Sequence, residues 1–294
     1  MIYRTCGLKI RSTLELPELP RVQNVGRNAN PPMPRNWWSI GRSPEGVEVV
    51  NLCWARVGRF RVTDRSITIF RASAAKDDLV RTYLLGPALG VLLHLRQMLV
   101  LHSSSVEIGG KAVAFAGKSG SGKSTIAFAL SQRGHRILSD DLLVLKRGHD
   151  RWTALSGPCV PKLWPKAARL LGAGNSQFER IHSWTSKRMA RPDIAVASCA
   201  RPLGCIYTLA LGRSPRIEKR PSRHQFRSLL RNAYCRTLAN ANDAIFYFMQ
   251  CTQLVRDVPV RELCRTRNPD GIKDFVELIE RDQEKMQCHA SADD

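Results

Sequence analysis

Eight residues near the middle of the 294-residue chain have the types and order of a phosphate-binding loop. The run Gly117-Lys118-Ser119-Gly120-Ser121-Gly122-Lys123-Ser124 matches the pattern G-x-x-x-x-G-K-[ST] in full. Glycines let backbone N–H groups turn toward an anion, the lysine reaches the β- and γ-phosphates, and the serine hydroxyl ligates Mg²⁺. We therefore predict that Gly117 to Ser124, together with Thr125, bind the phosphates of ATP with Mg²⁺.

Two adjacent carboxylates follow this loop closely. Asp140 and Asp141 lie 17 and 18 residues after Lys123, directly behind Arg136-Ile-Leu-Ser139. One helix and a reverse turn fill that gap, so we expect the next short strand to run back beside the loop strand. Its end then delivers both carboxylates to the γ-phosphate, one to hold the metal and one to deprotonate an attacking hydroxyl. The alternative is a pair of exposed aspartates in a turn.

The flanking residues predict the elements that position these groups. The apolar run Lys111–Ala116 predicts a buried strand before the loop, and Ser124–Arg133 has helical spacing up to the stop signal Gly134. Upstream, Leu99–Ile108 reads as a strand that turns at Gly109-Gly110 into the loop strand. Before it, residues 76–98 have helical periodicity that Pro87 bends or splits.

The remaining chain is predicted to contain a β-rich start and a mixed second half. Residues 1–75 carry partly alternating apolar residues between turn signals. Ile206–Leu211 is the best buried strand of the second half, whereas residues 229–248 and 271–285 have helical patterns. We expect a β-rich N-terminal domain over 1–75, a catalytic domain over 76–286 and a flexible tail over 287–294.

Charge and cysteine content bound the partners and the compartment. The chain has 46 Lys and Arg against 25 Asp and Glu, a formal charge of +21, which suits an acidic peptide, a polyphosphate or nucleic acid, or a generally basic surface. No helix-turn-helix, zinc-finger or RNA-binding signature supports nucleic acid. Nine cysteines without a C-x-x-C pair indicate a reducing compartment. No signal peptide or membrane span is apparent, so we predict a cytoplasmic protein.

The segment Gln132–Asp141, Q-R-G-H-R-I-L-S-D-D, together with the loop resembles the core of HPr kinase/phosphorylase, a bacterial protein-serine kinase. That family also has a histidine 21 residues before the loop lysine, the place of His102, and an acid five residues later, the place of Glu107. The resemblance implies that Asp141 is the general base toward the target serine and that Asp140 lies near Mg²⁺. It also implies that His102 lies close to this acidic group.

The same resemblance implies an α/β fold, a P-loop kinase core of the HPr-kinase/PEP-carboxykinase-like type with a smaller β-rich N-terminal domain. Two departures stand out: Lys118 occupies a position where these kinases usually have Asp, and their downstream glycine-rich signature is replaced by Pro161-Lys-Leu-Trp-Pro165. Such features resemble shorter paralogues that phosphorylate a serine of lasso-peptide precursors. HPr kinases form hexamers, so a homo-oligomer is compatible with the resemblance.

We therefore predict an ATP- and Mg²⁺-dependent kinase acting on a serine of a peptide or small protein, with Asp141, His102 and Lys123 as catalytic residues and Ser124 and Asp140 at the metal. The basic segment Arg213–Arg231 is expected to hold an acidic peptide or the polyphosphate, or to be a solvated face. Two alternatives are a small-molecule P-loop kinase and a nucleotide-switched regulatory or nucleic-acid-binding protein.

Overall fold

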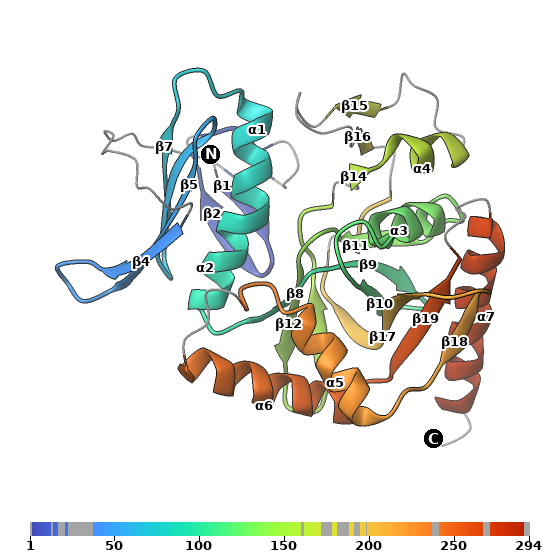
Figure 1. Cartoon of the computed structure of the whole chain (residues 1–294). Helices are drawn as coiled ribbons and strands as arrows, with labels where there is room; N and C mark the ends of the chain where they lie inside the picture. The colour runs from blue at the N-terminus through green and yellow to red at the C-terminus, as the bar shows by residue number, and fades with distance from the viewer. Residues whose placement is uncertain are drawn as a thin grey trace.

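The computed structural model describes residues 2–12, 14–16, 21–22, 38–159, 162–171, 178–180, 188–190, 195–197, 199–236, 241–266 and 271–290. The N-terminal strands and the first helices lie on one side of the molecule, and a large mixed sheet with the later helices lies on the other (Figure 1). Within the described residues, no helix combines the length and the apolar character that crossing a bilayer requires.

A nine-stranded sheet forms the centre of the molecule. Its main path has the order β11-β9-β10-β17-β13-β12-β8, and β19 joins β17 and also pairs with β18. The strands are β8 (Leu99–Leu101), β9 (Ser103–Ile108), β10 (Lys111–Ala116), β11 (Arg136–Ser139), β12 (Leu143–Arg147), β13 (Trp152–Leu155), β17 (Arg201–Leu211), β18 (Arg216–Glu218) and β19 (Val260–Arg265). The long strand β17 runs parallel to both β10 and β19, which joins the loop strand to the C-terminal part of the chain.

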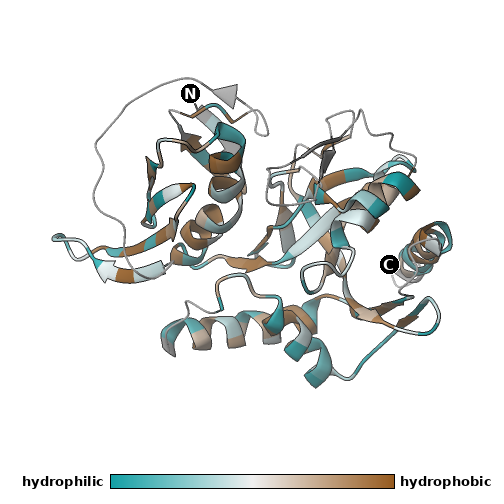
Figure 2. Cartoon of the chain, turned by 45° about the horizontal axis from the view of Figure 1, so that its top comes forward, coloured by the Kyte–Doolittle hydropathy of each residue, from teal (hydrophilic) through white to brown (hydrophobic). Residues whose placement is uncertain are grey.

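Alternation along β10 decides which helices cover which face of this sheet. Val113 and Phe115 pack in one cluster with α3 (Lys123–Ser131) and α7 (Ile272–Ala290). Ala112, Ala114 and Ala116 point to the opposite face, in a cluster with α5 (Ser222–Arg231) and α6 (Ala241–Asp257). The helices carry both hydrophilic and hydrophobic bands in Figure 2, as helices with one buried face do.

The N-terminal strands pack on the first helices rather than standing alone. β1 (Ile2–Thr5), β2 (Leu8–Arg11) and β3 (Arg21–Val22) form one sheet; β4 (Trp38–Arg42), β5 (Glu48–Trp54), β6 (Gly58–Val62) and β7 (Ile67–Arg71) form another. Their core includes residues of α1 (Asp77–Tyr83), the π-helical turn η1 (Leu84–Ala88) and α2 (Leu89–Leu95). This hydrophobic core therefore spans the predicted domain boundary after residue 75.

A small sheet lies above the phosphate-loop helix. It has the order β14-β16-β15, with β14 (Lys162–Leu163), β15 (Phe178–Arg180) and β16 (Arg188–Ala190). The short helix α4 (Pro165–Leu170) follows β14 and begins with proline at its first position, where a missing N–H costs nothing. Buried Phe128 of α3, Leu163 and Ala168 form the cluster that joins this layer to the core.

Several sequence predictions are confirmed and others are corrected. The loop strand, the helix after it and the hairpin at Gly109-Gly110 form as predicted. The predicted strand 99–108 is two strands interrupted at His102, and the predicted helix 229–248 is split into α5 and α6. The last helix α7 continues to Ala290, beyond the predicted start of the tail.

The strand that carries the two aspartates at its end was predicted to lie beside the loop strand, and this is wrong. β11 pairs with β9, because β9 and β17 already occupy the two edges of β10. Both pairings, β11 with β9 and β9 with β10, are antiparallel, so β11 runs in the same direction as β10. The carboxyl ends of β10 and β11 consequently meet at the same edge of the sheet.

The packing of α2 against Tyr234 generates a prediction about stability. A Cβ atom at Gly90 would lie 2.3 Å from a ring carbon of Tyr234, whereas one at Gly86 would lie 3.9 Å from its hydroxyl. We expect Gly90→Ala to lower the free energy of unfolding by about 1–3 kcal/mol, because the ring must leave its packed position. Gly86→Ala is the matched control and should stay within about 0.5 kcal/mol of wild type. Equal urea midpoints for Gly90→Ala and wild type would contradict the packing.

Candidate active site

The phosphate loop joins the end of β10 to the start of α3 and is shaped by its glycines. Gly120 and Gly122 have φ values of +80° and +101°, a backbone region that residues with a Cβ atom rarely adopt. A Cβ atom at Gly117 would lie 2.7 Å from the Ser121 hydroxyl oxygen. Gly122 also caps α3 without a side-chain hydrogen bond, so the first N–H groups of the helix remain directed at the loop.

Lys123 holds its ammonium group inside this loop. Its Nζ donates hydrogen bonds to the carbonyl oxygens of Gly117 at 2.8 Å and Lys118 at 3.1 Å, and the residue is buried. Arg265 of β19 also contacts the loop, because its Nε donates a hydrogen bond to the carbonyl oxygen of Ser121 at 2.6 Å. Burial lowers the pKa of Arg265. Two cations therefore contact the loop through backbone carbonyl groups.

Asp140 connects the end of β11 to the start of α3. The Ser124 hydroxyl donates to its two carboxylate oxygens at 2.9 and 3.1 Å, and the Ser104 hydroxyl of β9 donates to Oδ1. Burial, and then the charge of Asp141, raises the pKa of Asp140 to about 6, although the hydrogen bonds from the two serines oppose the shift. A buried carboxylate beside a hydroxyl thus lies next to the phosphate loop.

Asp141 has an uncommon backbone conformation, and its side chain pairs with a lysine. Its φ is +68°, in the left-handed region that Asp tolerates better than most residues. The Nζ of Lys162 lies 2.8 Å from Oδ2 of Asp141, and the backbone N–H of Lys162 donates to Asp140 Oδ2 at 3.4 Å. A single residue of β14 therefore contacts both aspartates, and Asp141 points toward a cation rather than into open solvent.

His102 and Glu107 lie in different surroundings. His102 lies between β8 and β9. Its backbone N–H donates to the carbonyl oxygen of Asn232 at 2.7 Å, and the centre of its ring is 6.1 Å from that of Tyr234. Burial and the charge of Asp141 raise the pKa of Tyr234, so this phenol lies within electrostatic reach of the aspartate. Glu107, five residues further along β9, pairs instead with Arg201 at 2.7 Å.

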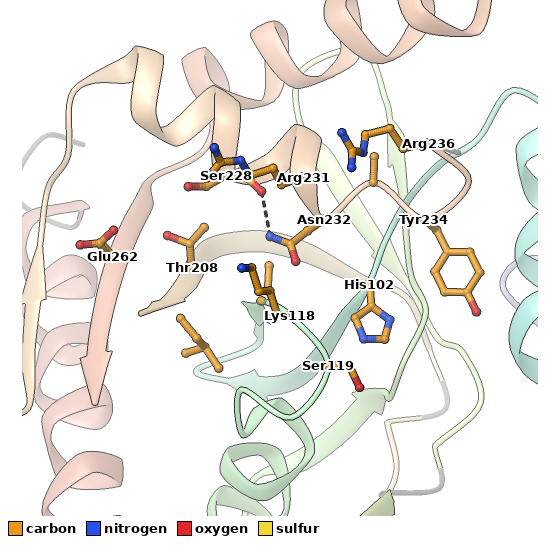
Figure 3. A pocket seen from close by; sticks show the side chains of 14 residues that line it. His102, Lys118, Ser119, Thr208, Ser228, Arg231, Asn232, Tyr234, Arg236 and Glu262 are labelled. Atoms are coloured by element: carbon orange, nitrogen blue, oxygen red, sulfur yellow. Dashed lines mark hydrogen bonds between the residues drawn. The ribbon is translucent and has the colours of Figure 1, made fainter. Parts of the chain in front are cut away.

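Two cavities flank the phosphate loop. A cavity of about 780 Å³ is lined by Gly117 to Ser119 on one side and by residues of the segment 228–236 on the other, with His102 between them (Figure 3). A second cavity of about 190 Å³ is lined by Gly120, Gly122 and Thr125 of the loop region together with Trp164 and Arg265. The loop thus lies between a larger cavity and a smaller one.

The structure places Ser124 in contact with Asp140 at the loop and His102 in the lining of the larger cavity, and it divides the basic segment. Arg220 and His224 both pair with Glu262, at distances of 2.6 and 3.0 Å, and Arg216 pairs with Glu218. Arg231, at the end of α5, lines the larger cavity instead. The segment therefore acts partly in ion pairs of its own and partly at the site.

Sequence reasoning missed three residues that contact the site: Ser104, Lys162 and Arg265. A signal existed for the first, since three consecutive serines, Ser103 to Ser105, are unusual in a buried strand. Lys162 was visible as the one charged residue in the run P-K-L-W-P, but nothing in the sequence linked it to Asp141. Arg265 lies 142 positions after Lys123, and no local pattern marks it.

Comparison with known proteins points to one family. Residues 94–164 match the family model described as "HPr Serine kinase C-terminal domain". HPr kinase/phosphorylase of Chlorobium phaeobacteroides (strain BS1) is 43% identical over 56 residues, which is 19% of this chain and 16% of that protein. The protein of the same description from Chlorobium luteolum is 48% identical over 46 residues, 16% of this chain and 14% of that protein. The match thus spans about one sixth of the length of these relatives.

A solved structure of an Hpr(Ser) kinase/phosphatase from Coxiella burnetii was also found. It covers 66% of this chain and 95% of that chain, with 15% sequence identity and a TM-score of 0.35.

The buried carboxyl of Asp140 generates a prediction about stability and pH. Its raised pKa means that the folded state binds this proton more tightly than the unfolded state, so ionisation costs stability as pH rises from about 4 to 7. Asp140→Asn removes that cost, which corresponds to roughly 3 kcal/mol for a shift of about two units. Without nucleotide or Mg²⁺, the stability of Asp140→Asn relative to wild type should increase between about pH 4 and pH 7.

Urea unfolding at several pH values measures this difference. Asp150→Asn is the control, because the Asp150 side chain is 88% exposed and its replacement should change stability little at any pH. A pH-independent difference for Asp140→Asn would contradict the proposed cost of ionisation.

Proposed function

We propose that this chain is an ATP- and Mg²⁺-dependent kinase that phosphorylates a serine hydroxyl of a peptide or small protein, because residues 94–164 are similar to the HPr kinase/phosphorylase family. One observation carries the proposal: the Ser124 hydroxyl and the Asp140 carboxylate lie 2.9 Å apart, with Lys123 and Asp141 adjacent to them in the chain. This set combines a phosphate cradle, a metal-binding pair and a candidate base at one edge of the sheet.

In this proposal the loop binds the triphosphate of ATP. Backbone N–H groups of Gly120 to Ser124 and the N-terminus of α3 would face the phosphate oxygens, and Lys123 would exchange its two carbonyl acceptors for them. The nucleoside would occupy the smaller cavity, where Trp164 is 46% exposed beside Thr125 and Arg265. An exposed tryptophan next to a phosphate loop supports this assignment, because aromatic rings stack on bases.

The residues present fit Mg²⁺. The hydroxyl of Ser124 and the carboxylate of Asp140 supply two oxygen ligands of the kind the ion prefers, and phosphates and water complete its shell. No cluster of three or more His, Cys, Asp or Glu occurs in the described part of the chain, and a Mg²⁺ held mainly by phosphates needs none. When bound, the ion would neutralise charge on the phosphoryl oxygens.

Asp141 would act on the acceptor. The serine oxygen forms a bond to the γ-phosphorus while the bond from that phosphorus to the bridging oxygen breaks, which yields phosphoserine and ADP. The serine proton passes to the Asp141 carboxylate, and Lys162, 2.8 Å from that carboxylate, orients it. We propose a biosynthetic precursor peptide of the lasso type as the acceptor, on the strength of the replaced glycine-rich signature at Pro161–Pro165.

The proposed base is tested by Asp141→Asn. We expect phosphoryl transfer to a pool of serine peptides to fall by roughly 10²- to 10⁴-fold, because the acceptor proton loses its base. The affinity for ATP should stay within a few-fold, since the loop and Lys123 are intact. A mass gain of one phosphate on the peptide measures transfer, and Asp150→Asn is the exposed control. Full activity of Asp141→Asn would remove this residue from the mechanism.

The role of Lys162 is tested by a pair of substitutions. Lys162→Met leaves Asp141 without its cation, and we expect kcat to fall by roughly 10- to 100-fold with little change in ATP binding. Lys162→Arg keeps the charge and should restore most of the rate. A purely structural role would instead lower the melting temperature of Lys162→Met and leave its kcat, measured well below that temperature, close to wild type.

A further inference from the structure

The larger cavity carries positive charge that the proposed catalytic chemistry does not use. Its lining contains three cations, Lys118, Arg231 and Arg236, and one carboxylate, Glu262, for a formal charge of +2. Glu262 is already paired with Arg220 and His224. Among the described residues, no carboxylate lies within ion-pair distance of Arg231, Arg236 or Lys118.

The two arginines are anchored to the sheet beside the phosphate loop. Arg231 ends α5 and Arg236 lies in the turn after it, on the side of the cavity opposite Lys118 and Ser119 (Figure 3). The segment between them is fixed to β8 by a bridge between Leu101 and Ala233 and by the Tyr234 N–H, which donates to the carbonyl oxygen of Val100 at 2.9 Å. The backbone that carries the two arginines is therefore held in place against β8.

We propose that Arg231 and Arg236 bind a carboxylate of the acceptor peptide close to its serine, so that the kinase selects acidic acceptors. The inference rests on the proposed function. The loop and Lys123 would hold the phosphates of the donor. The wall of the cavity that carries Arg231 and Arg236 would then face the acceptor peptide. Guanidinium groups bind carboxylates through paired hydrogen bonds, which suits recognition of one acidic group.

The basic segment as a whole is not the recognition element. Three basic residues in the first part of this region, Arg216, Arg220 and His224, are held in ion pairs with Glu218 and Glu262. Within this region of the chain, only the end of α5 and the turn after it contribute cations, Arg231 and Arg236, to the lining of the cavity. Arg223 and Arg227 lie on the same helix, are exposed and do not line the cavity, so they serve as matched controls.

Three serine peptides identify the carboxylate. The first has Asp two residues from serine and an amidated end, the second has Asn in place of Asp, and the third has Asn with a free terminal carboxylate next to serine. We expect kcat/KM for the first or the third peptide to exceed that for the second by roughly tenfold or more, mainly through KM. Whichever peptide is preferred identifies a side-chain or a terminal carboxylate as the source.

The double variant Arg231→Gln/Arg236→Gln should abolish this preference. The kcat/KM for the neutral peptide should stay within about twofold of wild type, and the affinity for ATP should not change. The variant Arg223→Gln/Arg227→Gln should keep the preference. Equal use of all three peptides by wild type would overturn the inference. So would a loss of ATP affinity, or an equal fall of kcat on every peptide, because the arginines would then serve the donor.

Binding separates this inference from the proposed kinase activity. The same peptides with alanine in place of serine cannot be phosphorylated, and their affinity is measured directly by fluorescence polarisation. Arg-dependent binding of the acidic alanine peptide, without phosphorylation of any serine peptide, would retain the recognition site and overturn the kinase proposal. Phosphorylation without any preference in rate or in binding would retain the kinase and overturn the recognition site.

Discussion

The hydrogen bonds from the Ser124 hydroxyl to the Asp140 carboxylate join the two segments on which the site depends. Ser124 belongs to the first turn of α3. Asp140 directly follows the strand β11, which lies two positions from β10 in the sheet. A buried carboxylate requires donors, and the Ser104 hydroxyl of the intervening strand supplies another. The site is therefore fixed by polar contacts across three strands rather than by the loop alone.

The intervening strand β9 sets the distance between the loop and the aspartates. Ser105 of β9 lies opposite Ser139 of β11, and their hydroxyl oxygens are 2.7 Å apart. The two buried hydroxyl groups satisfy each other by a hydrogen bond across the strand pair. Two serines of β9, Ser104 and Ser105, thus contact Asp140 and Ser139 through their hydroxyl groups.

The strong positive charge of the chain is organised locally. Acidic residues of the C-terminal half are largely paired: Glu280 with Arg133, Asp257 with Arg147, Asp282 with Arg261 and Glu262 with Arg220. Glu262, the carboxylate in the lining of the larger cavity, is therefore already held in an ion pair. The cations left over at the larger cavity, Lys118 and the two arginines of the segment 231–236, then determine its field.

The sequence by itself determined the local chemistry of this protein. The glycine positions, the apolar run of β10 and the helical spacing after it predicted a strand, a loop and a helix, because each depends on neighbours in the chain. The short spacing to Asp140 and Asp141 also predicted that these acids arrive at the loop. Strand order was not predictable, because the hydrophobic pattern of a strand does not name its partner.

Only the tertiary structure decided which distant side chains complete the site. Lys162 meets Asp141, Arg265 meets Ser121, and Tyr234 packs against Gly90, each across at least 20 positions. The basic segment looks like a uniform run in the sequence. The tertiary structure divides it into residues held in ion pairs and a residue that lines the cavity. Electrostatic and packing contacts depend on distance in space, and the positions of residues in the chain fix that distance only within single elements.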